Sequence, residues 1–76
     1  MKDLVEQIAR RFADNPRDVT VTELRGRHTV VLELRCGAGD VGRIIGKNGR
    51  TISAIRALLG VLAAKERCRT ILEVVG

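Results

Sequence analysis

The residues most capable of chemistry in this sequence stand together in one stretch, Ile44-Ile45-Gly46-Lys47-Asn48-Gly49-Arg50-Thr51-Ile52. Glycines let a phosphate backbone approach closely, and free N–H groups at the start of a following helix attract an anion. Lys47 and Arg50 add positive charge at the same place, and Asn48 can donate a hydrogen bond. The stretch therefore predicts a loop that holds nucleic-acid phosphates, although two glycines between two helices can also form a simple turn.

A second glycine pattern spells G-x-G-x-x-G after an expected strand, with its glycines at positions 37, 39 and 42. A dinucleotide-binding fold needs a further parallel strand ending in an acidic residue about 20 positions later, where this chain is inside a long helix. A P-loop fails as well, because Gly42 and Gly46 are one residue too close and Asn48 replaces the Ser or Thr that binds Mg²⁺. We interpret these glycines as a strand-to-helix turn.

The sequence offers little for catalysis or for metal binding. Its one serine, Ser53, and its one histidine, His28, are far apart, and its carboxylates form no cluster. Cys36 and Cys68 lack the spacing of metal ligands, and we expect both to be partly buried thiols. The chain is therefore expected to be no enzyme and to carry no cofactor and no metal.

Positive charge is concentrated in the second half of the chain. The formal net charge is +5; residues 1–34 hold six basic and six acidic groups, whereas residues 35–76 hold eight and three. No carboxylate occurs between Val41 and Lys65. Such a patch suits a polyanion, or else forms a solvated basic surface without a partner. Phe12 is the only aromatic residue, which excludes the base stacking of RRM and OB folds.

The first half of the chain predicts one helix and two strands. Apolar residues recur at helical spacing near the N-terminus, at Leu4, Val5, Ile8 and Phe12. The segment Asp14-Asn15-Pro16 ends this helix. Strands are then expected from Val19 to Leu24 and from Thr29 to Cys36, with a turn at 25–28. In the second strand one face carries Val30, Leu32, Leu34 and Cys36.

The second half predicts two helices and a last strand. A short helix fits between Asp40 and Ile45, and a longer amphipathic helix runs from the glycine loop to about Ala64. Its apolar face is expected to carry Ile52, Ile55, Leu58, Leu59 and Leu62. Alternation returns from Arg69 to Val75, which predicts a strand.

These elements predict one α+β domain over residues 1–76, in the order α-β-β-α-α-β. The helices should pack on one face of a three-stranded sheet. The strand, helix, helix and strand of the second half should form a right-handed crossover between parallel strands. Cys36 and Cys68 would then lie at opposite ends of the sheet, which argues against a disulfide between them.

The stretch around the glycine loop resembles the signature of the KH domain, which is an apolar pair, G-x-x-G and an apolar residue three positions later. Every position is met, the likeness covers essentially all 76 residues, and the order of elements is that of the bacterial type II form. The resemblance implies a groove for about four nucleotides of single-stranded RNA. By position, it implies that the backbone is held by Gly46, Lys47, Asn48 and Gly49. It places beside the groove Arg43, Ile45, Arg50 and Ile52, whereas Ile44 can belong to the core.

The resemblance to small bacterial proteins made of a single KH domain also implies partners and roles. It implies RNA chaperoning or post-transcriptional regulation, with links to cell shape in some bacteria, and association as a homodimer or as a heterodimer with a larger Jag-type KH protein. A possible interface is the uncharged side of the long helix, formed by Ala54, Ala57, Gly60 and Val61, unless these residues pack on the first helix of the same chain. The alternative function is a protein-interaction module with a vestigial G-x-x-G loop.

The location of the protein is expected to be cytoplasmic. No apolar run approaches the roughly 20 residues that span a bilayer, so we expect no membrane partner. The N-terminus alternates charged and apolar residues, unlike the continuous apolar segment of a signal peptide.

Overall fold

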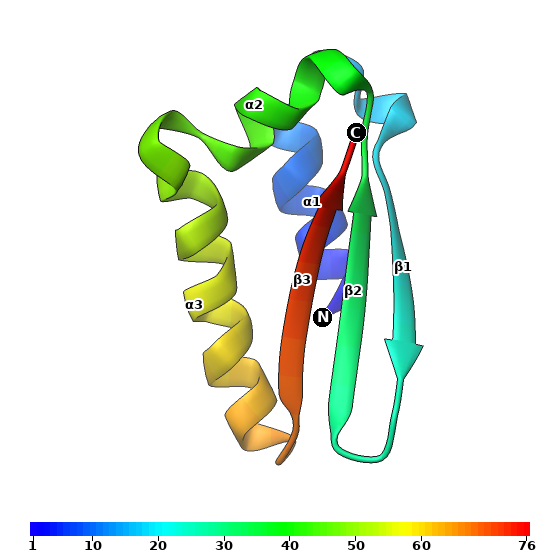
Figure 1. The fold of residues 1–76 in the computed structure, drawn as a ribbon, viewed down its shortest axis with the longest axis vertical. Helices are drawn as coiled ribbons and strands as arrows, with labels where there is room; N and C mark the ends of the chain where they lie inside the picture. The colour runs from blue at the N-terminus through cyan, green and yellow to red at the C-terminus, as the bar shows by residue number, and fades with distance from the viewer.

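The computed structural model describes residues 1–76, and its helices and strands follow the order that the sequence predicts (Figure 1). The bounds are α1 Lys2–Phe12, β1 Thr20–Arg25, β2 Thr29–Arg35, α2 Val41–Ile45, α3 Arg50–Lys65 and β3 Arg69–Val75. Three single turns of 3-10 helix join them: η1 Pro16–Asp18, η2 Ala38–Asp40 and η3 Lys47–Gly49. The predicted α+β class is confirmed, with element ends that differ by a few residues at most.

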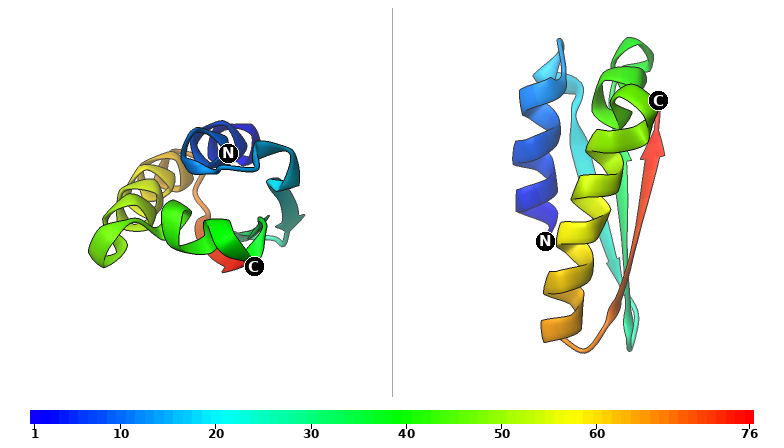
Figure 2. Two further views of the ribbon diagram at one scale, coloured as in Figure 1. Left: turned by 90° about the horizontal axis from the view of Figure 1, so that it is seen from above. Right: turned by 90° about the vertical axis from the view of Figure 1, so that its left-hand side faces the viewer.

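The sheet has the strand order β1-β2-β3, so β2 is central and β3 is an edge strand. Strands β1 and β2 pair antiparallel, whereas β2 and β3 pair parallel with Val31 opposite Ile71. The parallel pair is connected through α2 and α3. Figure 2 shows the helices on one side of the sheet, which confirms the predicted layers. The two cysteines lie at opposite ends of this pair, as expected, and both are free thiols.

The core lies between the sheet and the helices. Strand β2 turns alternate residues inward, and burial of a leucine such as Leu32 or Leu34 stabilises the fold by about 1.5–3 kcal/mol. The facing helices contribute a buried stripe made of Val5 and Ala9 on α1, Ile44 on α2, and Ile52, Ile55, Leu59 and Ala63 on α3. The glycine loop is thus carried by two helices that are both anchored in this core.

Two residues of the predicted apolar helix faces are not in the core. Phe12 is 47% exposed and Leu58 is 41% exposed. The fully buried positions of α1 are Val5 and Ala9; Phe12 lies on nearly the same side of the helix but is its last residue, where its side chain stays exposed. Phe12 and Leu58 instead line a groove between α1 and α3. Helical periodicity identified the apolar faces of these helices, but it does not show how much of each face the neighbouring elements cover.

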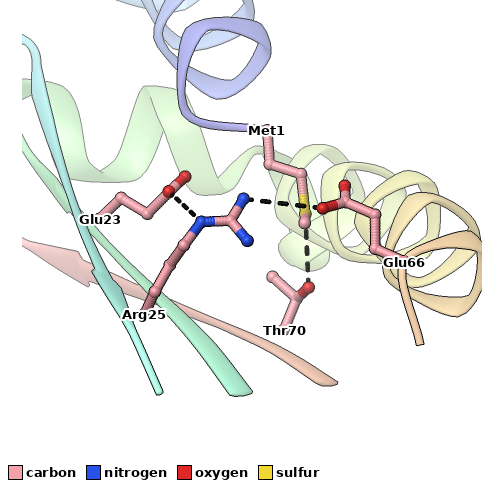
Figure 3. A network of polar contacts seen from close by, with 5 residues as sticks. All are labelled: Met1, Glu23, Arg25, Glu66 and Thr70. Carbon is pink, nitrogen blue, oxygen red and sulfur yellow. Dashed lines mark hydrogen bonds and ion pairs between the residues drawn. The ribbon is translucent and has the colours of Figure 1, made fainter. Parts of the chain in front are cut away.

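Polar contacts close the end of the sheet that is remote from the glycine loop (Figure 3). The guanidinium of Arg25 lies 2.7 Å from the carboxylate of Glu23 and 3.6 Å from that of Glu66. The hydrogen bond to Glu23 is the main cause of the raised pKa of Arg25. The hydroxyl of Thr70 donates to the sulfur of Met1 at 3.5 Å. These contacts tie β1 to the end of α3, and the start of α1 to β3.

None of the helices is both long and apolar enough to cross a bilayer.

Candidate nucleic-acid interface

The loop between α2 and α3 is a tight turn with left-handed backbone at three of its four residues. Gly46 has φ 80°, Asn48 has φ 57° and Gly49 has φ 72°. Glycine adopts such angles without steric cost, and asparagine tolerates them better than most residues with a side chain. The amide of Gly49 donates to the carbonyl of Gly46 at 3.0 Å. The residue types at these positions therefore follow from the shape of the turn.

Gly46 is also constrained by a close neighbour. A Cβ atom added there would collide with the side chain of Thr51 in the first turn of α3, whereas one added at Gly49 would meet open space. The first glycine thus lets the start of α3 fold back against the end of α2. The second is required by its backbone angle and leaves free space beside the loop.

The side chains of the loop are exposed and uncommitted. Lys47, Asn48 and Arg50 are exposed, and none of the three makes a side-chain hydrogen bond or an ion pair. The backbone amide of Arg50, the first of α3, donates to the carbonyl of Lys47, so the free donors of the loop are those of its side chains. The loop therefore gathers cationic and amide side-chain donors with no acceptor assigned to them, an arrangement suited to phosphate oxygens.

The isoleucines around the loop divide between core and surface. Ile44 is fully buried, so the alternative that it belongs to the core is confirmed. Ile52 is 5% exposed and packs in the same core cluster. Ile45 is half-buried at the end of α2. Of the predicted apolar groove residues, Ile45 offers the larger accessible surface, whereas Ile52 mainly supports the loop from below.

Arg43 lies in α2 and is ion-paired, unlike the cations of the loop. Its guanidinium is 2.9 Å from Oδ2 of Asp14 and 3.6 Å from Oδ1 of Asp40. Asp40 is the only buried charged residue of the chain. Hydrogen bonds from the backbone amides of Asp14 and Asn15 are the main cause of its lowered pKa. Sequence reasoning missed Asp40, because the groups it binds come from a distant segment of the chain.

A basic residue of the same stretch that the predicted site did not include is Arg56. Its Nη2 atom donates to the carbonyl of Leu72 at 3.0 Å, which links α3 to the edge strand β3. Around this contact is an open groove of about 310 Å³, lined by Arg56, Leu59, Thr70, Ile71 and Leu72. The absence of nearby carboxylates in the sequence marked Arg56 as part of a basic surface. It did not indicate that Arg56 contacts the edge of β3.

A larger, more apolar groove of about 380 Å³ lies between α1 and α3. It is lined by Ile8, Phe12, Arg50, Thr51, Ala54, Ile55 and Leu58. The neighbouring small residues Ala57 and Gly60 are exposed, as are Ala54 and, at 59%, Val61. The alternative that this side of α3 packs on the first helix is therefore wrong. The expected uncharged surface faces outward.

The remaining chemistry-bearing residues do not converge. His28 lies in the loop between β1 and β2, and Ser53 lies in the first turns of α3, at the other end of the molecule (Figure 1). No group of three or more His, Cys, Asp or Glu side chains gathers where a metal ion could be held. The glycine loop and its two flanking helices are the arrangement that stands out.

Comparisons with known proteins agree with this picture. Residues 2–74 match the sequence model of a family described as KhpA/KhpB, KH domain. The RNA-binding protein KhpA of Clostridium perfringens is 41% identical over 75 residues, which are 99% of this chain and all of that protein. The KhpA proteins of Chlamydia caviae and Aquifex aeolicus are each 42% identical over 74 residues, covering 97% of this chain and 95% and 94% of theirs. No solved structure matches the chain.

Proposed function

Because the chain belongs to the KhpA/KhpB family of KH domains, we propose that it binds single-stranded RNA through the loop Gly46-Lys47-Asn48-Gly49. The observation that carries the proposal is the left-handed turn with the uncommitted side chains of Lys47 and Asn48. Relatives that share about two-fifths of its residues are named RNA-binding proteins. The protein acts as a binder, and no catalytic step is assigned to it.

In the proposed complex the loop holds the sugar-phosphate backbone. Lys47 and Arg50 neutralise phosphates, Asn48 donates a hydrogen bond, and the glycines allow the strand to approach the main chain. Bases lie beside Ile45 with little contribution from the more deeply buried Ile52. Arg43 contributes from α2, although it must share its guanidinium with Asp14. Contacts of this kind favour unpaired strands, whose bases can be splayed into a groove.

The proposed cellular role is that of a cytoplasmic RNA chaperone or post-transcriptional regulator. A footprint of about four nucleotides gives few contacts and hence modest affinity. A second binding module would raise the apparent affinity through effective concentration. We therefore include self-association in the proposal, and association with a larger KH protein of the Jag type.

The outward side of α3 is the proposed surface for self-association. Ala54, Ala57 and Gly60 would let a second helix approach closely, and Phe12 and Leu58 stand on the same side as exposed apolar side chains beside a groove. A two-fold interface requires that the protruding side chains and the groove that receives them belong to the same patch of the surface. This side of the molecule meets that requirement.

A double substitution of the loop tests the RNA proposal. Lys47→Asp with Asn48→Asp places two carboxylates against phosphate, and both native side chains are exposed, so the fold should persist while RNA binding is lost. The matched control is Arg27→Asp with His28→Asp, an equal change in formal charge on exposed residues at the far end of the molecule. Fluorescence anisotropy with a labelled single-stranded RNA measures both variants.

The control variant distinguishes the loss of a specific binding site from a general effect of negative charge on RNA affinity. The control variant should keep most of the wild-type affinity. Near wild-type affinity in the loop variant would contradict the assignment of the site, and an equal loss in both variants would leave only non-specific attraction. The exposed apolar side of α3 favours the alternative of a protein-interaction module, for which crosslinking in cells would recover no RNA.

A further inference from the structure

The glycine loop depends on a helix that cannot be stable by itself. Helix α2 has five residues, Val41–Ile45, and helices far longer than this are marginal in water. Its position must therefore come from tertiary contacts. The fully buried Ile44 is one anchor, close to the loop. The other end of α2 begins at Asp40, which is 1% exposed.

Asp40 links this end of α2 to the segment that follows α1. Its Oδ1 atom accepts the amide hydrogen of Asp14 at 2.9 Å, and its Oδ2 atom accepts that of Asn15 at 3.0 Å. Each carboxylate oxygen therefore holds one backbone donor, and no buried polar side-chain atom is left without a partner. The contact joins segments that are 25 and 26 residues apart.

Arg43 reinforces the same connection from outside. It lies one turn after Asp40 and reaches both the buried carboxylate and, at 2.9 Å, the exposed carboxylate of Asp14. An exposed ion pair contributes little to stability, because solvent screens it. The two backbone hydrogen bonds inside are charge-assisted and shielded from solvent, and they are the stronger part of the link.

We propose that Asp40 is a positioning residue of the RNA-binding site, which fixes α2 to the end of α1 and thereby sets the place of the glycine loop. This inference rests on the proposed function of the loop. Asp40 itself touches no RNA, because it is buried beneath Asp14 and Asn15. Without its two hydrogen bonds, α2 spends less time in the binding position, and the apparent dissociation constant rises as that fraction falls.

The substitution Asp40→Asn separates positioning from charge. Asparagine has nearly the same shape but only one acceptor oxygen, so one backbone amide faces an NH₂ group. Removing a negative charge near the site would by itself strengthen RNA binding. If Asp40 positions the loop, the substitution should instead weaken RNA binding. The dissociation constant for a short single-stranded RNA of random sequence should rise about tenfold, if the competent fraction falls to about a tenth.

Two control variants test for a pure charge effect and for a loss of global stability. Asp18→Asn removes the same charge from an exposed residue of η1 that accepts no hydrogen bond, and RNA affinity should be unchanged or slightly higher. Val30→Ala lowers global stability from the end of β2 remote from α2 and should leave affinity unchanged while the protein remains folded. Hydrogen exchange in Asp40→Asn should accelerate in residues 41–49 more than in β2.

Asp40→Glu gives an independent test should Asp40→Asn fail to fold. It keeps the charge and both acceptor oxygens but displaces them by one methylene, and it should also weaken RNA binding. Wild-type affinity in a folded Asp40 variant, or an equal loss in Val30→Ala, would overturn the positioning role. Absence of RNA binding by the wild-type protein would instead overturn the proposed function, so the two failures are distinguishable.

Discussion

At the scale of single residues, the loop and its support use opposite chemistry. Lys47 and Asn48 are exposed and without partners, which keeps their donors available. Asp40 is buried and has a donor at each oxygen. A polar group without a protein partner can hydrogen-bond to water at the surface, but in the interior it raises the free energy of the folded state. The protein therefore places its free donors at the surface of the loop and its satisfied acceptor at the buried start of α2.

The two hydrogen bonds that the carboxylate of Asp40 accepts predict that the stability of the fold depends on pH. The pKa of Asp40 is lowered by the amides of Asp14 and Asn15, so the folded state favours the ionised carboxylate. Its contribution should be complete above the ordinary aspartate pKa of about 4 and should be lost as the pH falls through the lower folded value. Urea unfolding of wild type and Asp40→Asn should show a difference in unfolding free energy at pH 7 that shrinks below about pH 4. A difference that stays constant down to about pH 2 would contradict this role of the carboxylate.

At the scale of elements, α3 performs two tasks on opposite sides. Its inner side places Ile52, Ile55 and Leu59 in the core. Its outer side is uncharged over several turns and is exposed. The N-terminal turn of the same helix carries Arg50 beside the glycine loop. In the proposed function this helix serves both RNA and a second copy of the chain, and the two surfaces meet at Arg50, which also lines the groove between α1 and α3.

The outer side of α3 predicts how self-association can be removed. The wild-type chain should form a homodimer at micromolar concentration, and Ala57→Glu should remain monomeric, because a two-fold axis brings the new carboxylates close together in a dry interface. Thr20→Glu, at an exposed residue of β1, is the control and should dimerise normally. Light scattering across a dilution series measures the mass. A wild-type monomer at high concentration would refute self-association, and co-purification would then test the heterodimer alone.

At the scale of the whole molecule, exposed cations occur at both ends of the long axis. The loop at one end carries Lys47 and Arg50 without carboxylates attached to them, whereas the cation Arg25 at the other end is paired with Glu23 and Glu66. A net charge of +5 attracts any polyanion. Arg27, Lys65, Arg67 and Arg69, at the end remote from the loop, are exposed and unpaired as well, so charge alone does not select the site and the glycine turn must do so.

The cations beside the glycine loop predict the salt dependence of RNA binding. Neutralising about three or four phosphates of a single strand should give a slope of log K against log salt of about −2 to −3. Anisotropy titrations at several salt concentrations measure it. A flat response would contradict the electrostatic part of the proposal. A fully paired hairpin without an open loop or overhang should compete poorly, because its bases remain stacked.

The sequence by itself determined the order of the elements, the buried face of β2 and the position of the glycine loop. All three depend on local rules. Alternation in β2 places Val30, Leu32 and Leu34 on one face whatever lies opposite, and the glycines mark the turn through their own backbone angles. The match to the KH signature depends on the same adjacent residues, so it could be recognised from the sequence.

Only the tertiary structure decided which side chains remain free to bind. Arg43, Lys47 and Arg56 look alike in the sequence, yet Arg43 is paired with acids, Arg56 with the edge of β3, and Lys47 with nothing. The partners of Asp40 lie 25 and 26 residues away, and the exposure of Phe12 depends on the packing of α1 against its neighbours. Such contacts join distant segments, and no local pattern encodes them, because they arise only when the helices close over the sheet.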